Sequence, residues 1–195
     1  HLHGIDDLRI FSHKNSFAMS KDKIISEKFP DTVFRKCINK FDTNGDGYFS
    51  DSELNAVTAI YCTGSSFKNI KSIEGVKLFK NLGSLHIYDN SLTGTLDVSG
   101  MTKLAYIYCD NNKLTGINAQ GCTSLKVLEC NNNQLTSLNV SGCSNLETIK
   151  AHVNNFTTLT IRNLSKLKTL TVNMCEKLTE LDCSYNALTS LNAMS

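Results

Sequence analysis

A short pattern of leucine, cysteine and asparagine returns along this chain at a nearly constant interval, and it constrains the fold more than any other feature. The segment from Leu125 to Leu135 fits the template L-x-x-L-x-C-x-x-N-x-L. Other copies begin at Leu82, Leu104, Leu146 and Leu178, and a degenerate copy begins at Val57, with Ser65 in place of the asparagine. The copies at 104, 125 and 146 follow one another every 21 residues. Such a repeat predicts a solenoid in which each copy forms one coil.

Each coil is expected to contribute one strand to a continuous sheet. Template positions 1, 4 and 6 would point inward, and positions 3 to 7 would form a strand that pairs in parallel with the next one, about 4.8 Å away. The asparagine would then turn the chain, because its amide can bond main-chain groups that the turn leaves unpaired. A ladder of asparagines is therefore predicted, formed by Asn90, Asn112, Asn133, Asn154 and Asn186.

The second half of each coil is periodic as well. It reads L-x-x-L-x-V-x-G-C from Leu135 to Cys143, and a close variant runs from Leu114 to Cys122. Because Thr, Ser and Val favour strands over long helices, we expect a strand-like back. Residues 57–195 are thus predicted to form a leucine-rich-repeat β-solenoid with a parallel front sheet and a strand-like back half.

One irregularity interrupts the alternation of front and back halves. The back-half pattern occurs twice in succession, from Phe156 and again from Leu167. Either one of these two segments occupies the front sheet, or a coil is distorted there. The copy that begins at Leu178 is assigned to the front sheet, which would place Asp182 on its outer face.

The eight cysteines raise the question of a disulfide framework. Seven of them fall at inward positions of the coils: Cys62, Cys109, Cys130 and Cys183 in front halves, and Cys122, Cys143 and Cys175 in back-half patterns. A small buried thiol packs well in such a stack, and neighbouring parallel strands suit disulfide geometry poorly. We therefore expect structural free thiols, with disulfides or a metal site as the alternatives.

A second motif lies ahead of the repeats. The segment from Asp42 to Glu53 satisfies the spacing D-x-[DN]-x-[DN]-G-x5-E of an EF-hand calcium loop. A hard cation of this kind is held by oxygen ligands at such a spacing. The predicted ligands of one calcium ion are the side chains of Asp42, Asn44, Asp46 and Glu53 and the main-chain carbonyl of Tyr48, with a water at Ser50. The alternative is an acidic turn that only looks like the motif.

The flanks of this loop predict a small helical cap over residues 29–56. Asp31 can cap a helix that runs toward Phe41, and a second short helix is expected to reach Ala56. A lone loop of this type at the end of a solenoid is best interpreted as a structural clamp, because the open first coil of a repeat array needs a cover. Residues 1–28 then form a separate N-terminal extension.

The charge of the chain argues against a nucleic-acid-binding protein. It has 20 basic and 18 acidic residues, no basic block and a formal net charge of +2. Its apolar runs are only a few residues long, so no membrane span is expected. No nucleophile–base pair and no pair of catalytic carboxylates can be assembled from the repeats, so we expect a binding protein rather than an enzyme.

Aromatic residues gather at the outward positions of the first front strands. Side chains alternate between the two faces of a strand, and the residues that would share the outer face are Tyr61, His86, Tyr88, Tyr106 and Tyr108. Asp89, Asp110 and Glu129 would border them. Tyrosine is common in binding hot spots and can also stack on sugars. The alternative role is cross-strand packing that only stiffens the sheet.

The two motifs together resemble a known group of proteins. The phrase Phe29-Pro-Asp, followed by Phe41-Asp-Thr-Asn-Gly-Asp-Gly and then by the repeats, is similar to that of the secreted and surface leucine-rich-repeat proteins of gut-dwelling bacteria. The resemblance covers roughly residues 29 to 195. It implies a secreted or cell-surface location and a role in adhesion or partner binding, without identifying the partner.

The leading hypothesis is therefore a bacterial surface or secreted module that binds a host or microbial protein or glycan through its front sheet. The alternative is a structural spacer of a longer surface protein. The sequence stops within a half repeat at Ser195, where an uncapped coil would expose an apolar edge. Further repeats or self-association through this C-terminal coil would cover that edge.

Overall fold

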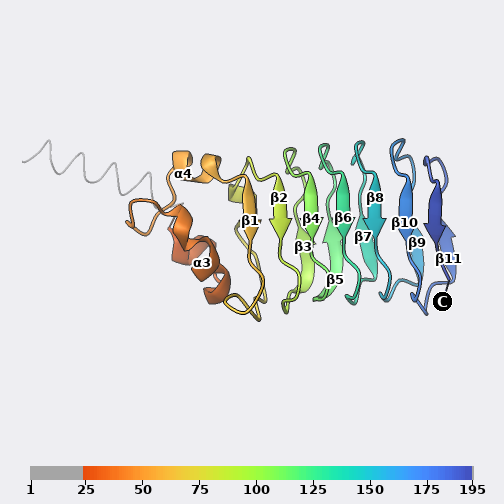
Figure 1. The fold of residues 1–195 in the computed structure, drawn as a ribbon, viewed down its shortest axis with the longest axis horizontal. Helices are drawn as coiled ribbons and strands as arrows, with labels where there is room; N and C mark the ends of the chain where they lie inside the picture. Colours follow the sequence, from red (N-terminus) through yellow and green to blue (C-terminus); the bar gives the residue numbers. More distant parts are fainter. Residues whose placement is uncertain (1–23, 195) are drawn as a thin grey trace, which may run out of the picture.

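The computed structural model describes residues 24–194, in which a helical cap leads into a stack of coils (Figure 1). Residues 1–23 of the predicted extension lie outside the described part of the chain. The cap consists of α2 (Ile25–Lys28), α3 (Thr32–Ile38), the 3-10 helix η2 (Asn39–Phe41) and α4 (Asp51–Ala56). The expected helices after Asp31 and before Val57 are therefore present. No helix in residues 24–194 is long and apolar enough to cross a membrane.

The front sheet is a row of parallel strands that lie side by side along the solenoid (Figure 1). Its seven strands are β1 (Ala59–Tyr61), β2 (Ser84–His86), β4 (Tyr106–Tyr108), β6 (Val127–Glu129), β8 (Thr148–Lys150), β10 (Thr169–Thr171) and β12 (Ser190–Asn192). From β4 onward each strand begins 21 residues after the one before it. The parallel front sheet predicted from the repeat interval is confirmed.

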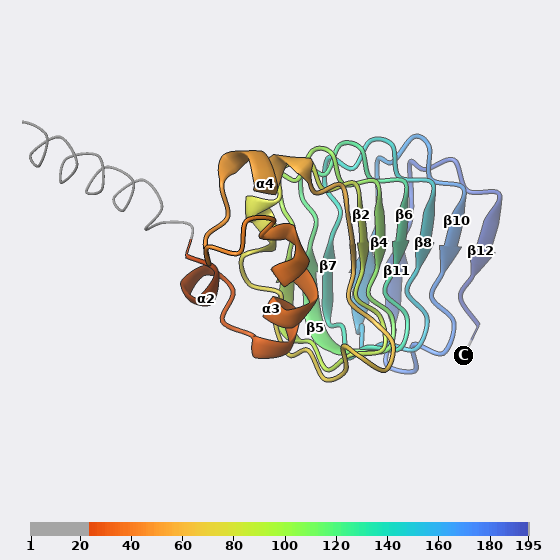
Figure 2. The ribbon, with the colours of Figure 1, turned by 60° about the vertical axis from the view of Figure 1, so that its left-hand side comes forward.

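The back of the solenoid is made of strands as well, which confirms the second prediction about the coils. β3 (Thr93–Asp97), β5 (Lys113–Asn118) and β7 (Ser137–Asn139) form one parallel sheet, and β9 (Thr158–Thr160) pairs with β11 (Glu180–Asp182). A short 3-10 helix, η3 (Val76–Leu78), lies in the longer connection between β1 and β2. Figure 2 shows the front and back strands facing each other across the interior.

The interior between the two sheets is one continuous apolar core. The central residues of the first six front strands are completely buried; they are Ile60, Leu85, Ile107, Leu128, Ile149 and Leu170. The same cluster includes Phe29 and Phe34 of the cap. Burial of each such side chain contributes on the order of 1.5–3 kcal/mol. The cap and the coils therefore stabilise one another through a shared core.

The predicted asparagine ladder forms at the turn that follows the front strands. The amide of Asn133 donates to the carbonyl groups of Cys109 and Cys130, both at 3.1 Å. Its oxygen accepts a hydrogen bond from the main-chain N–H of Leu114 at 3.0 Å. The same three kinds of bond are made by Asn90, Asn112 and Asn154. Each amide thus joins its own coil to the preceding one.

The irregularity after Phe156 reflects an exchange of the two half-coil patterns. Thr169–Thr171 occupy the front sheet as β10, between β8 and β12, which is the first of the two alternatives. The assignment of the copy at Leu178 to the front sheet is wrong, because β11 pairs with β9 at the back and carries Asp182 there. Both half-coil patterns space their apolar residues alike, so the constant coil length decides which strand lies in front.

The exchange also moves one member of the expected ladder. Asn186 lies at the back turn, where its amide donates to the carbonyl groups of Ile161 and Cys183, so its predicted place at the front is wrong. Cys175 stands at the front turn instead, with its Sγ 3.4 Å from the carbonyl oxygen of Ala151. Equivalent thiol bonds are made at the back turn by Cys122 and Cys143. An asparagine amide or a cysteine thiol can occupy these turns, because both can donate a hydrogen bond to a carbonyl group of the preceding coil.

The expectation of free thiols is wrong for one pair of cysteines. Cys37 of α3 forms a disulfide with Cys62, which follows β1, and their Cα atoms are 5.8 Å apart. Neighbouring parallel strands suit disulfide geometry poorly, but Cys37 lies on a cap helix, so this restriction does not affect the pair. The other described cysteines are free thiols as expected; they are Cys109, Cys122, Cys130, Cys143, Cys175 and Cys183.

Apolar side chains are exposed at the far end of the solenoid. Leu191 is 48% exposed and Met194 is 79% exposed. Strand β12, which contains Leu191, pairs with β10 on one side. The apolar edge expected from the sequence is therefore present in the described residues.

Candidate functional site

The front sheet gathers aromatic residues at its capped end. Neighbouring strands are in register, so Tyr61 of β1 lies opposite His86 of β2, and His86 lies opposite Tyr108 of β4. The residue before each of them is buried in the core, and side chains alternate along a strand. The three rings therefore share the outer face of three adjacent strands.

These three rings form a stack along the sheet. The ring centroids of Tyr61 and His86 are 4.3 Å apart, those of His86 and Tyr108 are 4.7 Å apart, and both interplanar angles are 29°. Tyr88 meets the stack edge-on, with its ring centroid 6.4 Å from that of His86. Aromatic pairs of this kind contribute about 0.5–1.5 kcal/mol beyond the burial of their area. The sheet thus holds the rings in defined positions.

Tyr106 is the one residue of the predicted set that makes no ring contact within the described part of the chain. It lies two residues before Tyr108 on the same face of β4, opposite Ser84 of β2. We call the set of Tyr61, His86, Tyr88, Tyr106 and Tyr108 the aromatic patch. Tyr61 is 54% exposed and Tyr106 is 38% exposed, so the patch is open to solvent.

Partial burial shifts the pKa of two side chains of the aromatic patch, His86 and Tyr108. Burial lowers the pKa of His86, whose Nε2 lies 2.8 Å from the hydroxyl oxygen of Ser84. Burial, followed by the negative charge of Glu129, raises the pKa of Tyr108. Burial thus disfavours the charged form of both side chains.

Carboxylates border the aromatic patch, as expected from the sequence. Burial and the nearby charges of Glu129 and Asp89 raise the pKa of Asp110, although its own main-chain N–H opposes the shift. Glu129 forms an ion pair with Lys150, with 3.3 Å between Oε1 and Nζ. Asp89 accepts a hydrogen bond from Nδ2 of Asn111 at 2.7 Å. Two of the three carboxylates thus have side-chain partners within the chain.

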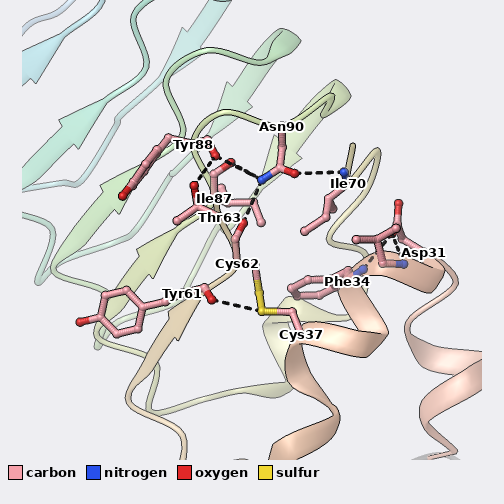
Figure 3. The surroundings of a disulfide bond; sticks show 11 residues. Asp31, Phe34, Cys37, Tyr61, Cys62, Thr63, Ile70, Ile87, Tyr88 and Asn90 are labelled. Atoms are coloured by element: carbon pink, nitrogen blue, oxygen red, sulfur yellow. Dashed lines mark hydrogen bonds between the residues drawn. A yellow bond between two sulfur atoms is a disulfide. The ribbon is translucent and has the colours of Figure 1, made fainter. Parts of the chain in front are cut away.

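The first strand of the patch is held from behind by the cap (Figure 3). Sγ of Cys37, in the disulfide, lies 3.2 Å from the carbonyl oxygen of Tyr61. The amide of Asn90 donates to the carbonyl oxygen of Cys62 at 2.8 Å. In Figure 3 the rings of Tyr61 and Tyr88 project away from this disulfide. This support was not predicted from the sequence, although Cys37 lies on the apolar face of its helix.

The acidic loop between η2 and α4 is closed by its own main-chain hydrogen bonds. Asp42 accepts hydrogen bonds from the N–H groups of Gly47 at 2.9 Å and of Asp46 at 3.3 Å. Asp46 in turn accepts from the N–H of Tyr48 at 3.0 Å. Gly47 has a φ of +84°, a left-handed conformation that glycine adopts without a steric penalty. The carboxylates of Asp42 and Asp46 are therefore directed toward the loop.

Glu53 joins the two ends of this loop. Its Oε2 accepts a hydrogen bond from the N–H of Thr43 at 2.6 Å, and its Oε1 accepts one from the N–H of Ser50 at 2.9 Å. The hydroxyl of Ser50 accepts in return from the N–H of Glu53, which makes a capping box at the start of α4. Although burial acts in the opposite direction, these hydrogen bonds lower the pKa of Glu53.

The donor atoms of the loop suit a hard cation. The predicted ligands Asp42, Asn44, Asp46, Glu53 and the carbonyl of Tyr48 lie in this one loop and offer oxygen atoms. Within residues 24–194, no three His, Cys, Asp or Glu side chains converge into a metal site of their own. An ion in the loop would therefore depend on Asn44 and on the carbonyl of Tyr48 in addition to the carboxylates.

Burial disfavours the thiolate form of several cysteines, and two open hollows lie on the described surface. Burial raises the pKa of Cys143 to about 12 and also raises the pKa of Cys109 and Cys130, which disfavours the reactive thiolate. One open hollow of about 390 Å³ lies between residues 71–77 and β3, and another of about 550 Å³ lies beside α3. Neither of these two hollows is lined by His or Cys.

Comparisons with known proteins bear on the fold. No protein-family model and no curated protein matches this chain. The leucine-rich-repeat domain of LRIM1 matches with a TM-score of 0.52 and 15% identity, over 80% of this chain and 52% of that one. An internalin of Listeria monocytogenes matches with a TM-score of 0.40 and 16% identity, over 88% and 84% of the two chains. The functional domain of InlJ from the same species matches with a TM-score of 0.34 and 21% identity, over 86% of this chain and 53% of that one.

At these identities the likeness concerns the fold alone. The chain spans about half the length of the LRIM1 domain that it matches. The parallel front sheet, the strand-like back and the 21-residue coils agree with that match. The chain is thus a β-solenoid of the leucine-rich-repeat type with a small helical cap at its N-terminal end.

Proposed function

We propose that this chain is a non-catalytic binding module that docks a protein partner on its front sheet, at the aromatic patch. The observation that carries the proposal is the stack of Tyr61, His86 and Tyr108 on a solvent-facing surface. Clustered apolar groups on a protein surface commonly mark interaction sites. Tyrosine is also enriched among the few residues that supply most of the energy of an interface.

Stiffening of the sheet is a weaker account of the same rings. Strands β6, β8 and β10 keep the same register, and at the position of the stack they carry Glu129, Lys150 and Thr171. The solenoid therefore continues without aromatic rings at this position. The concentration of rings at the capped end favours a role in binding.

The geometry of the stack favours a protein over a glycan. A sugar stacks on a free ring face, but the two faces of His86 are covered by Tyr61 and Tyr108. Because the stack runs along the sheet, ring edges and tyrosine hydroxyl groups face outward. Such a surface combines apolar area with hydrogen-bonding groups, as the cores of protein interfaces do.

We also propose that the module is secreted or held on a bacterial surface, where it takes part in adhesion to a host or microbial protein. The disulfide between Cys37 and Cys62 supports this location, because disulfides persist in oxidising compartments and are rare in the cytosol. The resemblance of residues 29–195 to secreted and surface repeat proteins supports it as well.

Selection of a random peptide library on the immobilised chain tests the docking site. Peptides selected on the wild-type chain are expected to bind the Tyr88→Ala/Tyr108→Ala variant about 30-fold more weakly or worse, because two hot-spot side chains together contribute roughly 2 kcal/mol or more. The dissociation constants are measured by surface plasmon resonance, alongside the melting temperature of each variant.

Tyr185→Ala is the matched control for this experiment. Tyr185 is 72% exposed and follows the back strand β11, so its removal deletes a surface tyrosine outside the aromatic patch. The selected peptides are expected to bind this variant as they bind the wild type. Peptides that bind the folded double variant with undiminished affinity would place the docking site elsewhere and refute the proposal.

We propose further that the acidic loop binds one calcium ion and acts as a structural clamp of the cap. Asp42, Asn44, Asp46 and Glu53 would supply side-chain oxygens, and Tyr48 would supply its carbonyl. Each carboxylate oxygen can accept more than one bond, so the main-chain N–H groups leave it capacity for a cation. The ion would also balance the negative charge of the carboxylates in this loop.

Calcium titration of chelator-treated protein tests this clamp. The melting temperature is expected to rise with added calcium, because a ligand at 100 times its Kd stabilises the folded state by about 2.7 kcal/mol. The Asp42→Ala/Glu53→Ala variant should show no rise. Glu176→Ala/Glu180→Ala removes two exposed carboxylates at the other end of the chain and should keep the response. A wild-type melting temperature that does not change on addition of calcium would contradict the proposed calcium clamp.

A further inference from the structure

Negative charge predominates around the aromatic patch. The outward side chains of β1, β2, β4 and β6 include no Lys or Arg; they are Ala59, Tyr61, Ser84, His86, Tyr106, Tyr108, Val127 and Glu129. Asp89 and Asp110 add negative charge just beyond the strand ends. The whole chain, by contrast, has a net charge of +2. The aromatic patch therefore has negatively charged surroundings on a weakly basic protein.

Asp110 and Tyr88 occupy neighbouring positions on this surface. The parallel pairing of β2 and β4 continues past their ends. The main-chain N–H of Ile87 donates to the carbonyl oxygen of Tyr108 at 2.9 Å, and that of Asp89 donates to the carbonyl oxygen of Asp110 at 3.1 Å. Tyr88 and Asp110 each lie two residues beyond a member of the ring stack, so they share its outer face. An aromatic ring and a carboxylate thus stand side by side on adjacent strands.

The carboxylate of Asp110 has no Lys or Arg partner. Among residues 24–194, no Lys or Arg forms an ion pair with it and no other side chain donates a hydrogen bond to it; the imidazole of His152 acts to lower its pKa, but burial and the neighbouring carboxylates raise it. Its neighbour Glu129, by contrast, is paired with Lys150. Half-buried and next to other carboxylates, Asp110 is a group whose charge an incoming cation would stabilise.

The back of the solenoid shows how this chain binds a cation with the same two groups. The guanidinium carbon of Arg162 lies 5.2 Å from the ring centroid of Tyr185. The same side chain forms an ion pair with Asp182, with 3.4 Å between Nε and Oδ2. A planar guanidinium can stack on an aromatic ring and pair with a carboxylate at once. On the front sheet the ring and the carboxylate are both present and the arginine is not.

We propose that Tyr88 and Asp110 form a receptor site for an arginine side chain of the protein partner. The inference rests on the proposed function, since it names the contact group that the partner presents at the aromatic patch. The guanidinium stacks on Tyr88 and pairs with Asp110, while the rest of the partner packs on the stacked rings. Lysine is the poorer occupant, because its ammonium group makes a point contact and cannot stack.

A titration of ¹⁵N-labelled protein with two matched peptides tests this site. Acetyl-Gly-Gly-Arg-Gly-Gly-amide and its citrulline counterpart have nearly the same shape, and only the first is charged. The arginine peptide is expected to shift the amide resonances of Tyr88 and Asp110, with a Kd on the order of 1 mM. The citrulline peptide is expected to bind about tenfold more weakly, because the charge-assisted contacts are lost.

Two variants of equal charge separate the site from general electrostatics. Asp110→Asn keeps the shape of the side chain and is expected to weaken the binding of the arginine peptide about tenfold. Glu180→Gln removes the same charge from β11 on the back and should leave the affinity unchanged. Equal binding of the two peptides, or full affinity of folded Asp110→Asn, would overturn the inference. So would a neutral oligosaccharide that shifts these resonances when the arginine peptide does not.

This inference and the proposed function fail in distinguishable ways. If the selected peptides depend on Tyr88 and Tyr108 but the titration shows no preference for arginine, the docking site stands and the arginine site falls. If the arginine peptide binds through Asp110 but the selected peptides bind the Tyr88→Ala/Tyr108→Ala variant with undiminished affinity, the docking site is refuted. The role of the arginine site as a partner contact is then refuted as well.

Discussion

Replacement of Asn133 by alanine is expected to lower the free energy of unfolding by roughly 1–3 kcal/mol, because it leaves the buried main-chain N–H of Leu114 without its hydrogen-bond acceptor. The carbonyl oxygens of Cys109 and Cys130 also lose a donor, but each keeps a bond from another ladder amide, that of Asn112 or that of Asn154. The side chain is only 8% exposed, so water has little access to replace the lost bonds. Urea denaturation measures the loss.

Asn145→Ala is the control for the asparagine ladder. The amide of Asn145 also donates to a carbonyl of the preceding coil, that of Thr123 at 2.7 Å, but this bond is exposed. Water can replace it, and the expected change is within about 0.5 kcal/mol. A loss at Asn133 as small as that at Asn145 would contradict the structural role assigned to the ladder.

Removal of the disulfide in Cys37→Ala/Cys62→Ala is expected to cost about 3 kcal/mol, since a cross-link of this span limits the freedom of the unfolded chain. The two cysteines are 25 residues apart in sequence and both are buried. The bond ties α3 of the cap to the end of β1, next to Tyr61. Its loss is therefore expected to loosen the cap and the first strand of the aromatic patch together.

Thermal melting with and without a reducing agent checks this expectation. The reducing agent should lower the melting temperature of the wild-type chain and leave that of the double alanine variant unchanged. Cys183→Ser changes a half-buried free thiol, so it should keep the wild-type response to reduction. A wild-type melting temperature that does not respond to reduction would show that the disulfide contributes nothing to stability.

The solenoid could be predicted because its coil interval is visible in the sequence. The 21-residue spacing from Leu104 is the spacing of the front strands from β4 to β12. The exchange of halves near Leu178 could not be predicted from the template, because front and back strands bury apolar residues at the same intervals. Only the accumulated coil length distinguishes them. The position of Asn186 at the back turn follows from that length.

The aromatic patch could be predicted from the alternation of side chains along β1, β2 and β4. The ring stack could not, because it depends on the torsion angles of each side chain. The disulfide was missed for a different reason: the repeat template compares coil with coil and cannot place Cys37 of the cap against Cys62. Calcium binding by Asp42 and Glu53 remains a prediction, which the titration decides.

Hydroxyl-radical footprinting of the chain bound to a selected peptide tests the central claim most directly. The chain has six tyrosines, of which four lie in the aromatic patch. Docking on the front sheet predicts that the peptide protects Tyr61, Tyr88, Tyr106 and Tyr108 and leaves Tyr48 and Tyr185 as reactive as in the free chain. Protection of Tyr185, or a bound peptide that leaves all four patch tyrosines reactive, would contradict this account of the molecule.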